Sequence, residues 1–376
     1  MGTRSKSGTR TSATRPSGPG ASPAHERDPA AAGPLAGRWL LAGKDGRLSA
    51  YARAEGGLLR WTERSPGGPD WDGPDLFPTD ALTDLAVGQG LDGYAHFVGR
   101  RRTRDGDAET VTYHHAVQYQ SGRPLGPWES LGTLYQRREQ SHRGGPPTVA
   151  VDGGGAPYVF VRNAGRGFHV RRQDAKGAWV AWQDLHGSKT FEGGCAGSTS
   201  EGRVLLAAPG EKGVSLWAQG RDGGPPAKGA DVPHPARDGS LCLVETAPGR
   251  TTLFWHAADG SGVFGHREGA GVLALGGGPA GPGALAAVRA VVDGYDCTVL
   301  AHRAADGRCA LAAYPTEHEA AGLWWTEIGE EGLGAPALAV DALGRVVVAS
   351  IGVRGELLVT RQKDSASLSL GSWHRC

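Results

Sequence analysis

The feature that most constrains this chain is a sequence phrase that recurs, in degraded copies, along its length. The sharpest copy spans residues 146–187 and contains short β-rich runs at 147–151, 157–162 and 167–173, with a tryptophan-containing ending at 179–185. Gly and Asp turns separate the runs. A unit of three or four short strands cannot bury its own apolar faces, so it must stack against its neighbours. The chain is therefore a repeat protein.

The spacing of the copies predicts the architecture. One glycine opens the second run of each copy, and these glycines are Gly46, Gly93, Gly155, Gly202, Gly249, Gly294 and Gly344. Successive differences between these positions are 47, 62, 47, 47, 45 and 50. A four-stranded propeller blade takes about 40–50 residues. We therefore predict an all-β fold, a single seven-bladed β-propeller of four-stranded antiparallel blades, with repeats near 38–80, 82–132, 146–187, 192–233, 238–277, 283–330 and 334–376.

The composition of the runs favours strands over helices. Segments such as 345–350 and 251–255 are β-branched or aromatic and are bounded by Gly or Asp-Gly. No window carries apolar residues at helical spacing over three turns, and residues 317–323 are long enough for only one or two turns. The 62 Gly and 24 Pro supply the turns that many short strands need.

Residues 1–33 lie outside the repeats. They contain no Leu, Ile, Val or aromatic residue, so they cannot bury apolar area to offset the entropy of ordering, and we expect a disordered tail ahead of a propeller at 37–376. The tail lacks the apolar stretch of a secretory signal, and no later segment is long enough to span a membrane. We therefore expect a cytoplasmic protein, and we expect removal of the tail to leave its stability unchanged.

Cysteine usage and charge argue against several function classes. The five cysteines are odd in number, fall in four repeats and form no Cys-x-x-Cys or Cys/His ligand spacing, so we expect reduced fillers, no metal site and no cofactor. The formal net charge is +1, which gives no general attraction to nucleic acid. The sequence contains no Gly-x-Ser-x-Gly, no His-Glu-x-x-His and no phosphate-binding glycine loop.

The strand pattern and the Trp-x-x-Trp-x-x-Leu ending at Trp179 and Trp182 resemble the PLL-like β-propeller lectins. That resemblance implies a propeller whose repeats bind fucose or O-methylated sugars between blades, with aromatic and polar side chains from adjacent blades. The ending is single at Trp71, Trp128 and Trp373, is shifted to Trp324 and Trp325, and is missing after Gly220 and Gly265. We therefore expect one or two sugar sites, or one repurposed central pocket, and we assign Trp128, Trp179 and Trp182 to ligand binding.

The long second interval arises from two basic additions. Residues 99–109 contain Arg101 and lie between the second and third strands of repeat 2, whereas residues 133–146 contain Arg138 and lead to repeat 3. In a four-stranded blade both connections lie on one face of the ring. Because long loops on a rigid scaffold often carry function, we predict that Arg101 and Arg138 bind ligand beside the cleft between blades 2 and 3.

The ends of the second strands point to the same face. Arg53 and Arg162 lie seven residues after their marker glycines, and His256 and His302 lie seven and eight residues after theirs. These four residues can ring the mouth of the central funnel, with the arginines holding a polar or anionic group and the histidines acting as general acid or base. A solvated strand end explains each of the four equally simply.

Two main function classes remain open from the sequence. The first is a lectin-like propeller that binds a glycan or another small polar, possibly anionic, ligand. The second is a propeller-fold lyase, cyclase or hydrolase with His256 and His302 as its catalytic residues. A protein-interaction platform is the third alternative.

Overall fold

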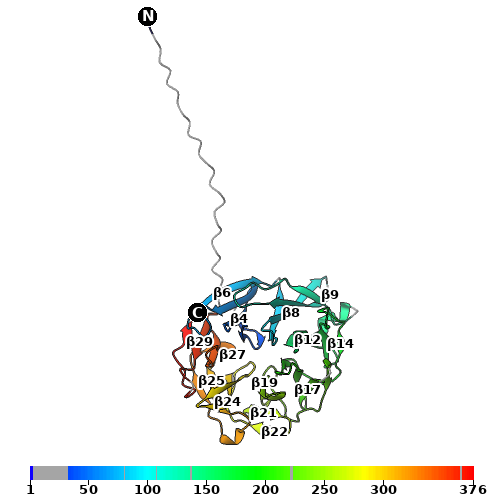
Figure 1. The fold of residues 1–376 in the computed structure, drawn as a ribbon. Coiled ribbons are helices and arrows are strands. Elements are labelled where there is room, and N and C mark those ends of the chain that lie inside the picture. The colour runs from blue at the N-terminus through cyan, green and yellow to red at the C-terminus, as the bar shows by residue number, and fades with distance from the viewer. Residues whose placement is uncertain (3–32, 80, 107, 136–137, 221–222, 365) are drawn as a thin grey trace.

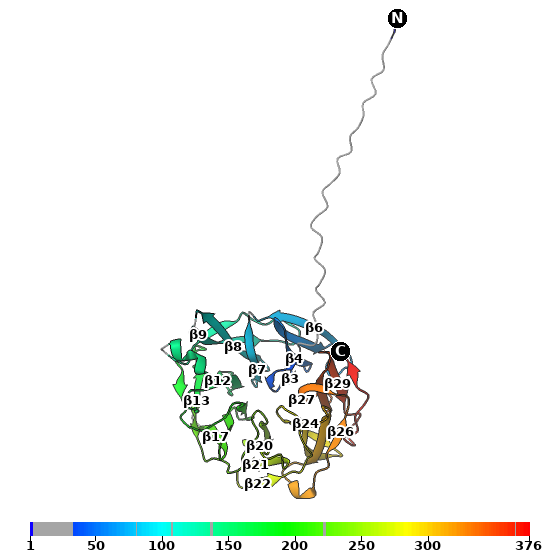
Figure 2. The same ribbon diagram turned by 180° about the vertical axis from the view of Figure 1, so that it is seen from behind.

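The chain folds into a closed ring of seven β-sheets around a central axis (Figures 1 and 2). The computed structural model describes residues 1–2, 33–79, 81–106, 108–135, 138–220, 223–364 and 366–376. Apart from residues 1, 2 and 33, the tail expected to be disordered lies outside this range. No helix in the described ranges is long and apolar enough to cross a membrane.

Each blade runs outward from an inner strand to an outer strand. Blade 1 consists of β3 (Leu40–Ala42), β4 (Leu48–Ala54), β5 (Gly57–Glu63) and β6 (Trp71–Pro78). Blade 2 consists of β7 (Leu82–Gln89), β8 (Ala95–Asp105), β9 (Ala108–Gln118) and β10 (Glu129–Gly132). Blade 3 consists of β11 (Pro147–Val151), β12 (Pro157–Arg162), β13 (Phe168–Arg172) and β14 (Gln183–Asp184).

The remaining four blades follow the same order. Blade 4 consists of β15 (Cys195–Ser198), β16 (Val204–Gly210), β17 (Gly213–Gly220) and β18 (Gly223–Lys228), and blade 5 of β19 (Cys242–Ala247), β20 (Arg250–His256), β21 (Val263–Arg267) and β22 (Gly271–Ala274). Blade 6 consists of β23 (Ala286–Val292), β24 (Tyr295–Arg303), β25 (Cys309–Pro315) and β26 (Thr326–Ile328). Blade 7 consists of β27 (Gly332–Val340), β28 (Val346–Gly352), β29 (Leu357–Arg361) and β30 (His374–Arg375).

The predicted fold class is confirmed, and burial explains it. Every residue of β11 and β28 is buried, because second strands and inner strands are covered on both sides by neighbouring blades. The outer strands β14 and β30 are short and exposed. The described helical structure is limited to two 3-10 segments, η2 (Arg138–Arg143) and η3 (Glu319–Ala321).

The basic addition expected as a loop at residues 99–109 is instead a strand hairpin. β8 and β9 pair continuously from Ala95 and Gln118 to Asp105 and Ala108. Cross-strand charge pairing explains the extension, because Arg102 Nη1 lies 2.5 Å from Glu109 Oε1 on the facing strand. The second addition forms η2, which is tied to the hairpin where the backbone N–H of Val111 donates to Ser141 Oγ.

Two short strands precede blade 1. β1 (Gly33–Pro34) pairs antiparallel with β4, and β2 (Ala36–Gly37) pairs parallel with the inner strand β7 of blade 2. Leu35, between them, is only 5% exposed. The folded sheet therefore includes residues that precede the expected start at Gly37.

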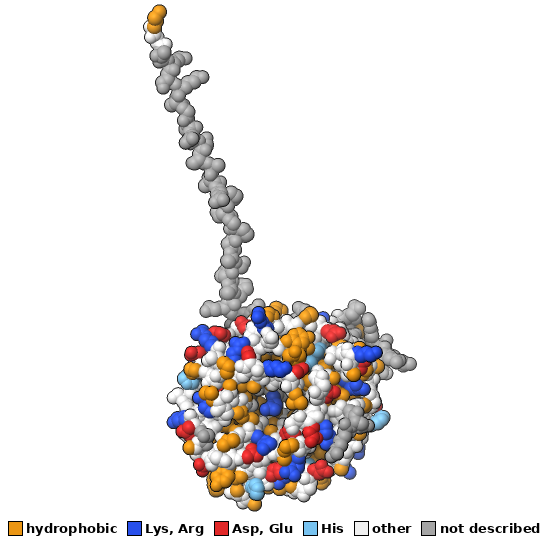
Figure 3. Space-filling model, viewed as in Figure 1, with side chains coloured by type: hydrophobic (Ala, Val, Ile, Leu, Met, Phe, Trp, Pro, Cys, Tyr) orange, Lys and Arg blue, Asp and Glu red, His pale blue; other side chains and the backbone are white. Residues whose placement is uncertain are grey.

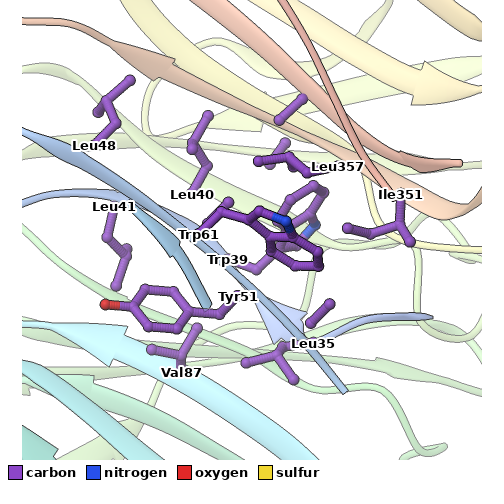
Figure 4. Close-up of a cluster of buried hydrophobic side chains, with 14 of the residues drawn as sticks. Leu35, Trp39, Leu40, Leu41, Leu48, Tyr51, Trp61, Val87, Ile351 and Leu357 are labelled. Carbon is purple, nitrogen blue, oxygen red and sulfur yellow. The ribbon is translucent and has the colours of Figure 1, made fainter. Parts of the chain in front are cut away.

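Apolar packing closes the ring between blades 7 and 1. Trp39 and Trp61 are each 1% exposed and lie against Ile351 and Leu357 of blade 7 (Figure 4). The same cluster continues into blade 2 through Val87. Trp39 Nε1 also donates to the carbonyl of Ala335 in β27, at 3.3 Å.

A buried ionic network accompanies this packing. Arg361 of β29 reaches from blade 7 to Glu63 of blade 1, with Nη1 to Oε1 at 2.7 Å, and it also contacts Asp341 Oδ2 at 3.3 Å. Both carboxylate side chains are fully buried. Glu63 Oε2 accepts from the N–H groups of Leu48 and Gly67, so the buried charge is both paired and hydrogen-bonded.

We predict that two truncations of the N-terminal segment differ in their effect on stability. Removal of residues 1–31 leaves the melting temperature unchanged, because the composition of that segment supports no packing. Removal of residues 1–38 deletes β1, β2 and the buried Leu35, a loss of about 2–3 kcal/mol, and lowers the melting temperature by at least about 3 °C. Differential scanning calorimetry of both truncations checks this; equal melting temperatures would show that β1 and β2 do not stabilise the ring.

Candidate functional site

A cleft of about 470 Å³ opens between the outer parts of blades 6 and 7. Blade 6 contributes β25, β26 and the segment before β26, whereas blade 7 contributes the segment between β29 and β30. The main lining residues are Ala312, Ala313, Trp324, Leu368, Leu370 and Trp373. Its volume lies in the range of about 300–1,000 Å³ that is typical of small-molecule sites.

Small residues keep this cleft open. β25 presents the side chain of Ala313 to it, and Ala312 also borders it. Gly329 follows β26 with a φ of +74°, and a Cβ at that position would lie 2.7 Å from the Trp373 ring. Only glycine satisfies both the backbone conformation and the close approach of the indole. Trp373 therefore lies flat against blade 6, beside the opening.

The two tryptophans give the cleft its chemical character. Trp324 is 78% exposed, which is unusual for the largest apolar side chain. Trp373 is half-buried, and its Nε1 makes no hydrogen bond to any residue that the structure describes. Together with the exposed Thr326, the cleft offers apolar ring faces and a few polar groups, an arrangement suited to a ligand with one apolar face and hydroxyl edges.

Tryptophans at matching places in other blades tie blades together. Trp182 Nε1 donates to the carbonyl of Leu131 in blade 2 at 3.2 Å, and Trp325 Nε1 donates to the carbonyl of Leu275, just after β22 in blade 5, at 3.1 Å. Trp179 Nε1 donates to Glu129 Oε2 at 3.0 Å. Trp128 packs, half-buried, against the cluster that joins blades 7, 1 and 2. The structure thus gives the three predicted sugar-binding tryptophans contacts within the scaffold.

The predicted arginines at strand ends occupy separate blades. Arg162 closes β12, and its Nε donates to the carbonyl of Thr190 in the connection to blade 4 at 3.0 Å. Arg53 is exposed near the end of β4, opposite Gly33 of β1. No described contact joins these two side chains to each other or to the two histidines.

The basic additions are partly neutralised. Arg100 is buried, pairs with Asp84 at 2.8 Å and donates to the carbonyl of Gly144 at 2.9 Å, so it is a structural residue. Arg101 is partly buried on β8, and Arg138 is the first residue of η2. Acidic and basic side chains are interspersed over the face shown in Figure 3.

His256 and His302 are brought together, but inside the protein. Each is 2% exposed, and their rings meet edge to face with centroids 4.7 Å apart at the boundary between blades 5 and 6. Both Nε2 atoms are buried without a described hydrogen-bond partner. Burial, aided by His302 and Arg237, lowers the pKa of His256 to about 3, and burial likewise lowers the pKa of His302.

A second buried histidine pair lies near blade 3. His96 Nδ1 and His115 Nε2, on β8 and β9, are 3.0 Å apart, and Trp179 packs edge to face on His115. Burial lowers the pKa of His96 to about 4 and that of His115 to about 3. The sequence analysis missed this pairing: His96 lies opposite Val117 and His115 opposite Val98, so the two histidines are diagonal neighbours whose contact depends on the exact strand register.

Among the described residues, no group of three or more His, Cys, Asp or Glu side chains is arranged to hold a metal ion. The five cysteines are free thiols.

Comparison with known proteins places the fold. No family model and no curated protein sequence matches this chain. The BP39L lectin from Burkholderia pseudomallei has a TM-score of 0.64 at 14% identity, with 91% of this chain and 99% of the lectin covered. AofleA from Arthrobotrys oligospora has a TM-score of 0.50 at 10% identity, covering 91% of this chain and 95% of that protein. The Hadza microbial sialidase Hz136 has a TM-score of 0.49 at 13% identity, covering 87% of this chain and 73% of the sialidase.

These likenesses concern the fold. They confirm, at that level, the expected resemblance to propeller lectins. Because a propeller supports both binding and catalysis, the function must be argued from the site.

We predict that the buried histidines make the fold sensitive to mild acid. Their folded-state pKa values lie below the ordinary value of about 6.5, so the unfolded chain binds more protons and stability falls as pH drops below that value. When the pH drops from 6.5 to 5, each histidine that stays neutral in the folded protein lowers the free energy of unfolding by about 2 kcal/mol.

Urea unfolding at pH 7, 6 and 5 measures this dependence, and the window lies above the titration of ordinary carboxylates. His256→Gln flattens the curve relative to wild type. A wild-type unfolding free energy that stays constant from pH 7 to 5 would contradict the assignment.

Proposed function

We propose that this propeller is a carbohydrate-binding protein and that the cleft between blades 6 and 7 is its binding site. The observation that carries the proposal is the exposure of Trp324 beside Trp373 in a cleft bordered by the small residues Gly329 and Ala313. A sugar has an apolar face that packs on indole and hydroxyl groups that need polar partners. Trp373 Nε1 and the Thr326 hydroxyl are placed to supply such partners.

The fold supports this proposal by analogy. BP39L, the matched propeller with a TM-score of 0.64, is named a lectin. The sequence resemblance to PLL-like propellers adds fucose and O-methylated sugars as the first ligands to test. In this chain, however, the candidate site is the seam between blades 6 and 7 and not the most regular repeat.

The enzyme alternative receives less support from the geometry. General acid or base catalysis needs a side chain within hydrogen-bond reach of the substrate. The Nε2 atoms of His256 and His302 are buried, and the burial that lowers their pKa values favours the neutral ring. As placed, this pair suits a structural role better than proton transfer to a ligand.

We predict that Trp373→Ala and Trp324→Ala each weaken glycan binding at least tenfold, a loss of about 1.4 kcal/mol or more, because each removes a ring face from the ligand. A glycan array followed by isothermal titration calorimetry measures the effect. Tyr119→Ala, which removes another exposed aromatic ring on blade 2, is the matched control and retains wild-type affinity.

The same variants separate the remaining alternatives. Unchanged binding in both tryptophan variants, with affinity lost in Trp179→Ala, would move the site to the seam between blades 2 and 3. Turnover of a glycoside by wild type that His302→Gln abolishes would favour the enzyme.

We predict that binding at the tryptophan cleft depends little on salt, because no ion pair with the ligand is involved. Affinity at 0.05 M and 0.5 M NaCl stays within about twofold, whereas exposed charges are screened beyond about 10 Å at 0.1 M. The double variant Arg101→Ala/Arg138→Ala binds as wild type does. A steep loss of affinity with salt that this double variant removes would instead place the ligand on the basic additions of blade 2.

A further inference from the structure

Trp324 and Trp325 are neighbours in sequence that serve opposite sides of blade 6. Trp324 lines the cleft toward blade 7. Trp325 faces blade 5, where its Nε1 donates to the carbonyl of Leu275 and its ring packs edge to face on His302, with centroids 4.8 Å apart. One peptide bond joins the two residues, so Trp324 and Trp325 share one short backbone segment between the two seams.

His302 in turn rests on His256 of blade 5. The three rings of His256, His302 and Trp325 form a continuous stack of edge-to-face contacts across the seam between blades 5 and 6. Hydrogen bonds anchor the two histidines: His302 Nδ1 lies 3.0 Å from the carbonyl oxygen of Arg303, and the backbone N–H of His256 donates to Ser240 Oγ at 3.2 Å. Both Nε2 atoms are buried without a described hydrogen-bond partner, as is the hydroxyl of Tyr314 in the apolar cluster that includes Trp325.

The charged groups around the stack oppose its protonation. Arg237, in the connection between blades 4 and 5, adds positive charge near both rings while its Nη1 donates to the carbonyls of Ala280 and Gly281. The Arg303 side chain donates from Nε to the carbonyl of Gly332 and forms an ion pair with Glu331. Glu327 of β26 is the one described acid whose charge favours protonated His302, and it already pairs with Arg308.

We propose that His256 and His302 form an acid-sensitive switch that holds Trp325, and through it Trp324, in place, so that mild acid opens the seam between blades 5 and 6 and disturbs the tryptophan cleft. Two positive rings in contact, next to Arg237 and with buried unsatisfied nitrogens, cannot remain in the closed seam. The consequence for ligand release rests on the proposed function; the movement of Trp324 does not.

The expected response is steep. Each histidine that is neutral in the closed seam and protonated in the open one raises the open population about tenfold per pH unit below its ordinary pKa of about 6.5. Two histidines acting together raise it about a hundredfold per unit. Neutral pH therefore keeps the seam closed, and the change falls between about pH 6.5 and 4.

The test uses the full chain labelled with 5-fluorotryptophan and followed by ¹⁹F NMR from pH 7.5 to 4. Trp324→Phe and Trp325→Phe assign the two resonances, and the resonance of the buried Trp217 in blade 4 reports on global unfolding. His302→Phe removes the titrating group that contacts Trp325 but keeps a ring in its place, and it leaves His256 as the remaining histidine of the seam. The double variant His96→Gln/His115→Gln is the matched control, because it removes the other buried histidine pair, far from this cleft along the ring.

We expect the Trp324 and Trp325 resonances to shift together in wild type and in the control, ahead of Trp217, and to shift much less in His302→Phe, which retains only His256. An unchanged Trp324 resonance in wild type, an equal shift in His302→Phe, or a shift only together with Trp217 would each overturn the switch. A parallel titration with L-fucose tests the ligand consequence: wild-type affinity falls at least tenfold from pH 7 to 5, and that of His302→Phe does not. If L-fucose does not bind at all, the proposed sugar class is wrong, while the resonances still decide the switch.

Discussion

Closure of the ring between blades 7 and 1 is the constraint on which the rest of this structure depends. Every other pair of neighbouring blades is joined by a direct connection of the chain, whereas blades 7 and 1 are held together only by non-covalent contacts: apolar packing, an ion pair and hydrogen bonds such as that of Trp39 Nε1 to the carbonyl of Ala335. Arg361 of blade 7 crosses the boundary to the fully buried carboxylate of Glu63, and the packed indoles of Trp39 and Trp61 lie beside it. Removing Arg361 would leave the buried Glu63 without its cation, whereas Asp341 would keep its ion pair with Arg345, and an unpaired buried charge is costly.

This closure also positions the candidate site. Blade 7 is fixed to blade 1 on one side, so its Trp373 is held against Gly329 of blade 6 on the other. The space between them stays open because β25 carries the small Ala313 there, not because the ring is loose. An underfilled seam on a rigid scaffold can hold a ligand because the surrounding packed elements keep its lining side chains in place.

The sequence predicted the fold well because the strands and turns of a propeller blade are determined by nearby residues: turn glycines such as Gly155 and Gly344, and β-branched runs between them. The site was harder to predict, because the openness of a seam depends on residues from two blades. Trp179 and Trp182 stand in the most regular repeat, and the structure uses their N–H groups to join blades 2 and 3. The irregular Trp324 and the single Trp373 were visible in the sequence, but only the alanine and glycine facing them, supplied by blade 6, show that they line a cleft. Likewise, strand-end counting placed His256 and His302 at matching positions, but it could not show that their rings pack on each other and that Trp325 packs on His302.

The central claim is that a ligand occupies the seam between blades 6 and 7, and a crystal structure of the protein with its best-binding glycan tests it most directly. The account predicts sugar density with its apolar face on Trp324 or Trp373 and a hydroxyl within hydrogen-bond distance of Trp373 Nε1. Well-defined sugar density at any other seam or in the central channel, with this cleft holding only solvent, would contradict it.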